Sequence, residues 1–167
     1  MSACPQCGVD LPDEDGPTHR YFGASPACWA AYCQVLEREY ADPAFFKNHR
    51  MTVDAYALQH PGASPQAVQS INIHLISATL IFKYKAKSDR ALKAMQTISA
   101  ASKRDKTLFD WLKPPASLGH ITVLDLLPMT RLDDHLKAVE DWARSAWQAW
   151  ENHHNIAETH LRRFGFI

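Results

Sequence analysis

Three cysteines near the start of the chain limit how this end of the molecule can fold. Cys4 and Cys7 lie in the sequence Cys-Pro-Gln-Cys-Gly, and Cys28 follows in Ser-Pro-Ala-Cys-Trp. A Cys-x-x-Cys turn presents two thiolates together, and a third cysteine from a nearby element is how small zinc sites are built. Residues 1–24 are also rich in proline and glycine, so this segment has little core of its own and needs a crosslink, such as a structural metal ion, to stabilise it. The sequence therefore predicts an irregular, zinc-binding segment over residues 1–24.

This pattern defines three zinc ligands and leaves the fourth open between two residues. Cys28 is predicted in the first turn of a helix, where unpaired amides favour a thiolate. Cys33 lies roughly 140° further around that helix, which places it poorly for the same metal ion. His19 lies in the loop between the cysteine turn and the helix, so we favour His19 over Cys33. A closed site of Cys4, Cys7, Cys28 and His19 would be structural rather than catalytic.

After residue 24 almost all boundary signals are those of helices. Ser25-Pro26 and Ser64-Pro65 each place an N-cap before a proline at the first helical position. Thr122 and Asp125 have capping-box spacing, so we expect a short helix rather than a strand over residues 121–127. The other helices predicted from caps and stops cover residues 26–40, 53–60, 65–85 and 88–102.

The last helix has the clearest pattern. Apolar residues keep helical spacing from residue 133 to about residue 163, while charged residues occupy the opposite face. Trp142, Trp147 and Trp150 lie on the apolar stripe, where core packing explains them. The chain is therefore predicted to be mostly α: a helical bundle over residues 25–167, with the zinc-stapled segment packed on it as part of a single compact domain.

Several of the nine histidines fall on faces that should point inward. His74 shares a face with apolar residues of its predicted helix, and His154 lies close to the stripe centred on Trp150. His60 and Asp54 come from the predicted helix 53–60. Imidazoles and a carboxylate that converge inside a bundle form a familiar divalent-metal site, suited to zinc, iron, manganese or nickel.

This inner set has two interpretations. If His60, His74, His154 and Asp54 hold a second metal with an open coordination position, a bound water or thiolate could act as nucleophile in hydrolysis or thiol transfer. Alternatively, these residues form a hydrogen-bonded polar core, for instance with His74 bonded to Asp54. His135 is expected on the surface.

Composition excludes several classes of function. Lysine plus arginine equals aspartate plus glutamate at 18 each, which argues against a nucleic-acid partner. The longest apolar run, residues 71–82, is too short and too polar to span a membrane. The chain starts without a secretory signal, so we expect a cytoplasmic protein with reduced thiols. Nucleotide-binding glycine loops and the common hydrolase motifs are missing.

The motifs together resemble a family of uncharacterised bacterial proteins. They are Cys-Pro-Gln-Cys-Gly, Asp-Gly-Pro-Thr-His at 15–19, Ala-Ser-Pro-Ala-Cys-Trp at 24–29, Val-Asp-Ala-Tyr-Ala-Leu-Gln-His-Pro-Gly at 53–62, Gln-Ser-Ile-Asn-Ile-His-Leu at 69–75, and the tryptophan-rich segment that ends in His-His at 153–154. That resemblance covers nearly the whole chain and implies no activity. The last helix is also similar to metal-binding four-helix bundles of the damage-inducible, thiol-transferase-like type.

Two functional hypotheses follow from the sequence. The first is a metal-binding protein with a structural zinc at the amino terminus and an inner site that takes a second divalent metal. The second is a non-enzymatic, zinc-stabilised binding or regulatory module. A small-molecule or protein partner, and a homo-oligomeric state, stay open.

Overall fold

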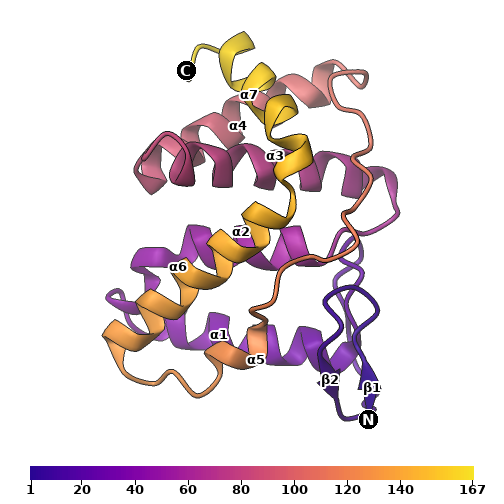
Figure 1. Ribbon diagram of the computed structural model, residues 1–167, viewed down its shortest axis with the longest axis vertical. Helices are drawn as coiled ribbons and strands as arrows, with labels where there is room; N and C mark the ends of the chain where they lie inside the picture. Colours follow the sequence, from indigo (N-terminus) through magenta and orange to yellow (C-terminus); the bar gives the residue numbers. More distant parts are fainter.

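The structure is a computed structural model that describes residues 1–167 and is almost entirely helical (Figure 1). In chain order the helices are α1 (Pro26–Ala41), α2 (His49–Gln59), α3 (Pro65–Phe82), α4 (Ser88–Arg104), α5 (Val123–Leu126), α6 (Leu132–Ala149) and α7 (His154–Arg163). Two short 3-10 turns, η1 (Phe45–Asn48) and η2 (Glu151–His153), precede α2 and α7. The mostly α-helical fold expected from the sequence is confirmed.

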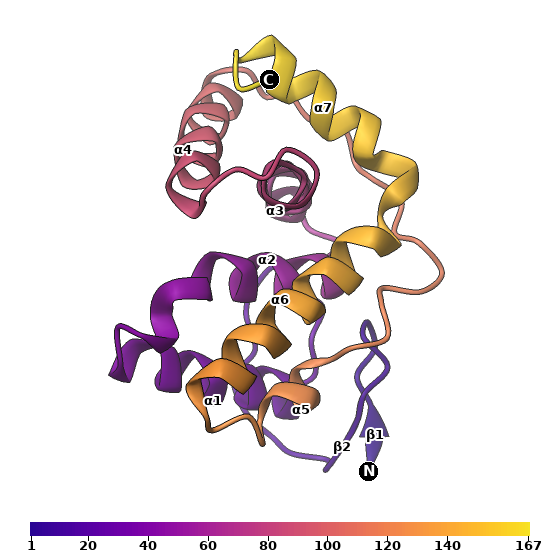
Figure 2. The ribbon, with the colours of Figure 1, turned by 60° about the vertical axis from the view of Figure 1, so that its left-hand side comes forward.

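The helices form two halves that meet along α2 and α3. Figure 2 shows α1, α2, α5 and α6 in one half and α3, α4 and α7 in the other. Helix α6 packs along α2, and its buried tryptophans are anchored there: Trp142 Nε1 donates to Gln59 Oε1 at 2.7 Å, and Trp150 Nε1 donates to the Leu58 carbonyl at 2.9 Å. Both tryptophans are fully buried, as their place on the apolar stripe predicts.

The starts of α1, α3 and α5 follow the capping signals of the sequence, whereas α2 starts at His49, four residues before the predicted start, and has no side-chain cap. The Ser25 and Ser64 hydroxyls accept hydrogen bonds from the backbone amides of Cys28 and Ala67, which would otherwise lack partners at a helix start. Thr122 forms a complete capping box, and α5 follows it, so the short helix expected there is confirmed.

The predicted last helix is broken at Trp150, which separates α6 from α7. No proline or glycine marks the break. At the break the Trp147 carbonyl accepts from the Trp150 amide at 3.1 Å and also from the His154 Nε2 at 2.9 Å, and the His154 ring stacks on the Trp147 indole. The chain therefore continues through the kink with tighter three-residue backbone bonds, and the His154 ring gives the carbonyl a second partner.

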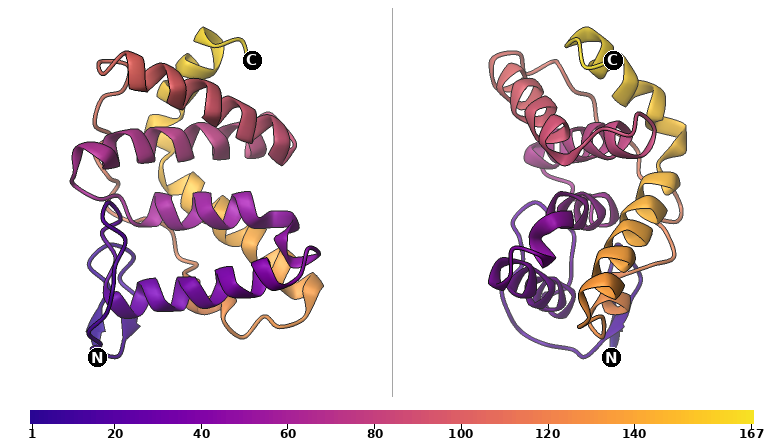
Figure 3. Two further views of the ribbon diagram at one scale, coloured as in Figure 1. Left: turned by 180° about the vertical axis from the view of Figure 1, so that it is seen from behind. Right: turned by 90° about the vertical axis from the view of Figure 1, so that its left-hand side faces the viewer.

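Residues 1–24 form an extended segment that runs beside the ends of α1 and α2 (Figure 3). Two short antiparallel strands, β1 (Ser2–Ala3) and β2 (Asp10–Leu11), flank the first two cysteines. Further along, Phe22 forms a bridge with Pro61, and the Gly23 amide donates to the His60 carbonyl at 3.3 Å. The segment therefore reaches the end of α2. None of the helices combines the length and apolar character needed to cross a membrane.

Candidate metal centre

Four donor atoms from three separate parts of the chain converge where the amino-terminal segment meets the helices. Cys4, Cys7, Cys28 and His60 offer ligand atoms that all lie within 4.8 Å of one another. The Cys28 sulfur is 3.8 Å from the Cys7 sulfur and 3.3 Å from His60 Nε2. Cys4 is 2% exposed, and Cys28 and His60 are fully buried. This group could hold a metal ion.

Local backbone structure positions each cysteine. The Cys4 amide donates to the Val9 carbonyl at 2.8 Å, and the Gly8 amide donates to the Cys4 carbonyl at 3.0 Å, which closes a tight turn around Cys7. Gly8 has a φ of 74°, a conformation that residues with a side chain rarely adopt. Cys28 lies in the first turn of α1, held by the Ser25 cap. The turn and the helix start therefore present three sulfurs to one point.

The His60 ring is oriented by a hydrogen bond on the side away from the cysteines. Its Nδ1 donates to the Tyr56 carbonyl at 2.8 Å, since a carbonyl can only accept. The neutral ring then has a bare Nε2 that faces the Cys28 sulfur, which is the form that binds metals. Tyr56 also stacks on the ring, with centroids 4.0 Å apart, and its hydroxyl donates to the Cys28 sulfur at 3.7 Å.

The thiols share their charge unequally. Hydrogen bonds from the Cys28 and Cys7 thiols hold the pKa of Cys4 far below its ordinary value. The pKa of Cys28 is raised by its hydrogen bonds with Cys4 and Cys7 and by burial. One thiolate is thus favoured at the expense of its neighbours, because a buried site without a cation disfavours several like charges. A divalent cation would allow all three sulfurs to ionise.

His60 occupies the position that the sequence assigned to His19 or Cys33. His19 lies instead among aromatic rings. Its ring stacks on Phe22 with centroids 4.5 Å apart and meets Tyr21 edge-on with centroids 4.2 Å apart. Its Nδ1 is buried and has no hydrogen-bond partner. Cys33 is exposed on α1. The loop around Phe22 pairs with the chain that follows α2, and this pairing carries His60 to the cysteines while His19 covers the aromatic cluster.

Only part of the predicted inner set comes together. His74 Nδ1 donates to Asp54 Oδ1 at 2.8 Å, and the Ser77 hydroxyl donates to Asp54 Oδ2 at 2.5 Å. His60 belongs to the cysteine group, and His154 is engaged with α6 at the helix break. The structure therefore joins two of the four residues, in the hydrogen-bonded arrangement that the sequence left as the alternative.

A second buried carboxylate was missed by the sequence, which placed His135 on the surface. His135 is fully buried, and its Nε2 donates to Glu39 Oε1 at 3.2 Å. The Glu39 carboxylate also accepts from His49 Nδ1 at 2.7 Å and from the Thr52 hydroxyl. Burial alone would raise the pKa of Glu39, but hydrogen bonds from His135, His49 and Thr52 outweigh it and lower that pKa. The sequence held one sign of this buried carboxylate, because Glu39 falls among the inward-facing apolar residues of α1.

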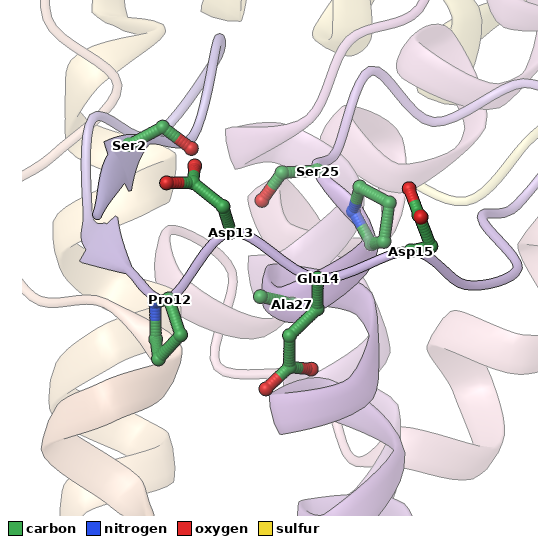
Figure 4. Close-up of a pocket in the computed structure, with 8 residues that line it drawn as sticks. Ser2, Pro12, Asp13, Glu14, Asp15, Ser25 and Ala27 are labelled. Atoms are coloured by element: carbon green, nitrogen blue, oxygen red, sulfur yellow. The ribbon is translucent and has the colours of Figure 1, made fainter.

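A polar hollow of about 270 Å³ lies outside the metal centre, over the start of α1 (Figure 4). Asp13, Glu14 and Asp15 line it, together with Ser2 and the first residues of α1. Asp13 already pairs with the amino-terminal ammonium group at 2.8 Å, which ties β1 to the chain that follows β2.

Comparisons with known proteins give a family and no activity. No curated protein and no solved structure shows significant similarity to this chain. The family model of a family of unknown function (DUF5946) matches residues 2–151, a range that contains all four donors of the candidate centre. The chain belongs to this family of unknown function.

Proposed function

We propose that Cys4, Cys7, Cys28 and His60 bind one zinc ion. Three thiolates and an imidazole are ligands that zinc prefers in tetrahedral sites. With zinc–sulfur bonds of about 2.3 Å, the sulfurs of a tetrahedral site lie about 3.8 Å apart. The Cys7 and Cys28 sulfurs are 3.8 Å apart, so this pair needs no movement to share the ion.

The zinc is proposed to be structural. All four positions of a tetrahedral site are supplied by the protein, and three of the four ligands are buried, so no position is left for a substrate or an activated water. The ligands come from the turn between β1 and β2, from α1 and from the end of α2. An ion there would join residues 1–24 to two helices that the segment otherwise touches through few hydrogen bonds.

The chain as a whole is proposed to be a zinc-stabilised binding or regulatory module. A metal-dependent hydrolase or thiol transferase at the inner set would need His60 and His154 beside Asp54 and His74, and both of these histidines are engaged elsewhere. A thiolate centre also persists best where thiols stay reduced, which supports a cytoplasmic location. The observation that carries the proposal is the convergence of four mostly buried donors on one point.

Metal analysis of chelator-treated and zinc-reconstituted protein tests this proposal. We expect one zinc ion per chain, with binding lost in Cys4→Ser and His60→Ala. Cys33→Ser and His19→Ala are matched controls, because the structure places these two residues outside the donor group. Retention of zinc in His60→Ala together with its loss in His19→Ala would overturn the proposed ligand set.

A further inference from the structure

A hollow of about 350 Å³ opens between the two halves of the molecule, away from the metal centre. One wall comes from η1 and the start of α2, and the other from the start of α4. Figure 2 shows these segments on the same side of the molecule, with α3 seen end-on beside α4. The residues that matter for its chemistry are Phe46, Lys47, His49, Arg50, Asp89 and Leu92.

The two walls each present a large apolar side chain to this hollow. Phe46 is 41% exposed and Leu92 is 45% exposed, although most large apolar side chains of the protein are covered. Phe46 is held in place by the His49 ring, which stacks on it with centroids 4.3 Å apart. Exposed apolar groups that line one concave surface are typical of ligand sites rather than of plain solvated surface.

Arg50 supplies a charged group that is fixed but not fully used. Its Nη2 donates to Asp54 Oδ1 at 2.9 Å, which anchors one edge of the guanidinium. Its Nε is buried without a hydrogen-bond partner, and its Nη1 makes no hydrogen bond but is not buried. An anchored guanidinium with free N–H groups is well prepared to bind a carboxylate.

The charges in and behind the hollow balance. Lys47 and Arg50 are cationic, and Asp89 is the one carboxylate that lines it. Asp54 lies behind Arg50, pairs with it and also accepts hydrogen bonds from His74 and Ser77. The attraction for a carboxylate therefore comes from the accessible Arg50 Nη1 and from Lys47 at the rim, and not from a net positive charge.

We propose that this hollow binds an amphipathic carboxylate, a small organic acid with an apolar chain. The chain lies between Phe46 and Leu92, and the carboxylate accepts hydrogen bonds from Arg50 Nη1. Lys47 adds attraction at the rim. The site does not share a residue with the proposed zinc centre, so either can be tested without the other.

Octanoate is the probe, and its binding is followed by amide chemical-shift changes in zinc-loaded protein. We expect saturable shifts confined to η1 and to the starts of α2 and α4. Because burial of a methylene is favourable, affinity should rise about fourfold per methylene from hexanoate to octanoate. Octan-1-ol should bind at least about tenfold more weakly, since it lacks the group that pairs with Arg50. Equal binding of octanol, or shifts centred elsewhere, would overturn the proposal, as would no binding at millimolar octanoate.

Two variants separate the contributions. Leu92→Ser should weaken octanoate about tenfold, whereas Trp111→Ser, which removes an equally exposed apolar side chain outside the hollow, should leave affinity unchanged. Arg50→Lys keeps a positive charge beside Asp54 but loses the planar fork, and it should remove most of the preference for octanoate over octanol. Unchanged octanoate binding in Leu92→Ser would show that the chain does not lie in this hollow.

Discussion

The amino-terminal donor group and the two buried carboxylates are all polar parts of the core, but their hydrogen-bonding needs are met differently. The oxygens of Glu39 and Asp54 already accept hydrogen bonds from histidine, serine or threonine side chains. The three thiols contact each other, the His60 ring, one tyrosine hydroxyl and the backbone at Gln6 and Val9. Thiols are weak hydrogen-bond donors and acceptors, so such a group gains far more from a cation than a saturated carboxylate does.

The largest effect should come from removal of the metal. Structural zinc in small domains contributes apparent binding free energies of about 10 kcal/mol or more at neutral pH. Chelation should therefore abolish hydrogen-exchange protection in residues 1–24 and in the chain after α2, while α3 and α4 keep theirs because they pack on each other. Uniform loss of protection over all helices would contradict this division, and no loss anywhere would argue against a structural ion.

Asp54→Ala comes next and tests the inner cluster. It leaves Arg50 largely buried without its anion, and loss of one partner of a buried pair costs about 3–5 kcal/mol. Urea denaturation measures this change, and metal content should stay at one ion per chain. Asp141→Ala is the control, because Asp141 pairs with Lys137 at the surface and its loss should cost under about 1 kcal/mol. Loss of metal in Asp54→Ala would show that the Asp54 cluster and the metal centre depend on each other, contrary to our account.

The pH dependence of stability should be a smaller effect and should come partly from His74. Burial lowers the pKa of His74 below its ordinary value of 6.5, despite the opposing influence of Asp54. The unfolded chain therefore binds this proton more readily, so the contribution of His74 is complete above pH 6.5 and is lost as the pH falls toward the lowered pKa.

Denaturation midpoints between pH 7.5 and pH 5, measured with excess zinc for the parent chain and for His74→Gln, isolate this contribution. The difference in slope should reach at most about 1.4 kcal/mol per pH unit. The zinc ligands are the same in both proteins, so their own pH dependence cancels in the comparison. Identical slopes would mean that His74 titrates alike in the folded and unfolded states.

Tyr56→Phe should give the smallest effect. It removes the hydroxyl that donates to the Cys28 sulfur but keeps the ring against His60. Because this contact is long, at 3.7 Å, zinc affinity should fall by no more than about tenfold, the lower end for groups that hydrogen-bond a metal ligand, and a competition titration with a chromophoric chelator measures this change. Tyr32→Phe is the matched control, since Tyr32 stacks on Tyr56 at 3.8 Å and its hydroxyl makes no hydrogen bond to the thiols. Equal zinc affinities for both variants would show that the Tyr56 hydroxyl does not contribute to metal binding.

Local signals in the sequence predict most of the fold. Ser25-Pro26, Ser64-Pro65 and the Thr122 capping box mark helix starts because caps act within one turn of the chain. The break at Trp150 escapes such rules, since the chain there has no proline or glycine. At the break the His154 ring bonds to a carbonyl of the preceding helix, a contact that hydrophobic periodicity does not reveal.

The candidate centre also has one part that local sequence signals predict and one part that they do not. Cys4, Cys7 and Cys28 are recognisable because a short turn and a helix start place them by local geometry. His60 reaches them only through the packing of residues 21–23 against residues 60–62. Gly62 permits that approach, because a Cβ there would lie 2.2 Å from the Tyr21 carbonyl oxygen. The sequence segment Gln-His-Pro-Gly holds a histidine at a rigid helix end, but nothing in it names the partner segment.

X-ray absorption at the zinc edge of the reconstituted protein tests the central claim most directly. The account predicts three sulfur ligands at about 2.3 Å and one nitrogen ligand at about 2.0–2.1 Å. A shell of four sulfurs would place Cys33 in the site, and two sulfurs with two nitrogens would bring in a second histidine. Either result would contradict the centre of Cys4, Cys7, Cys28 and His60.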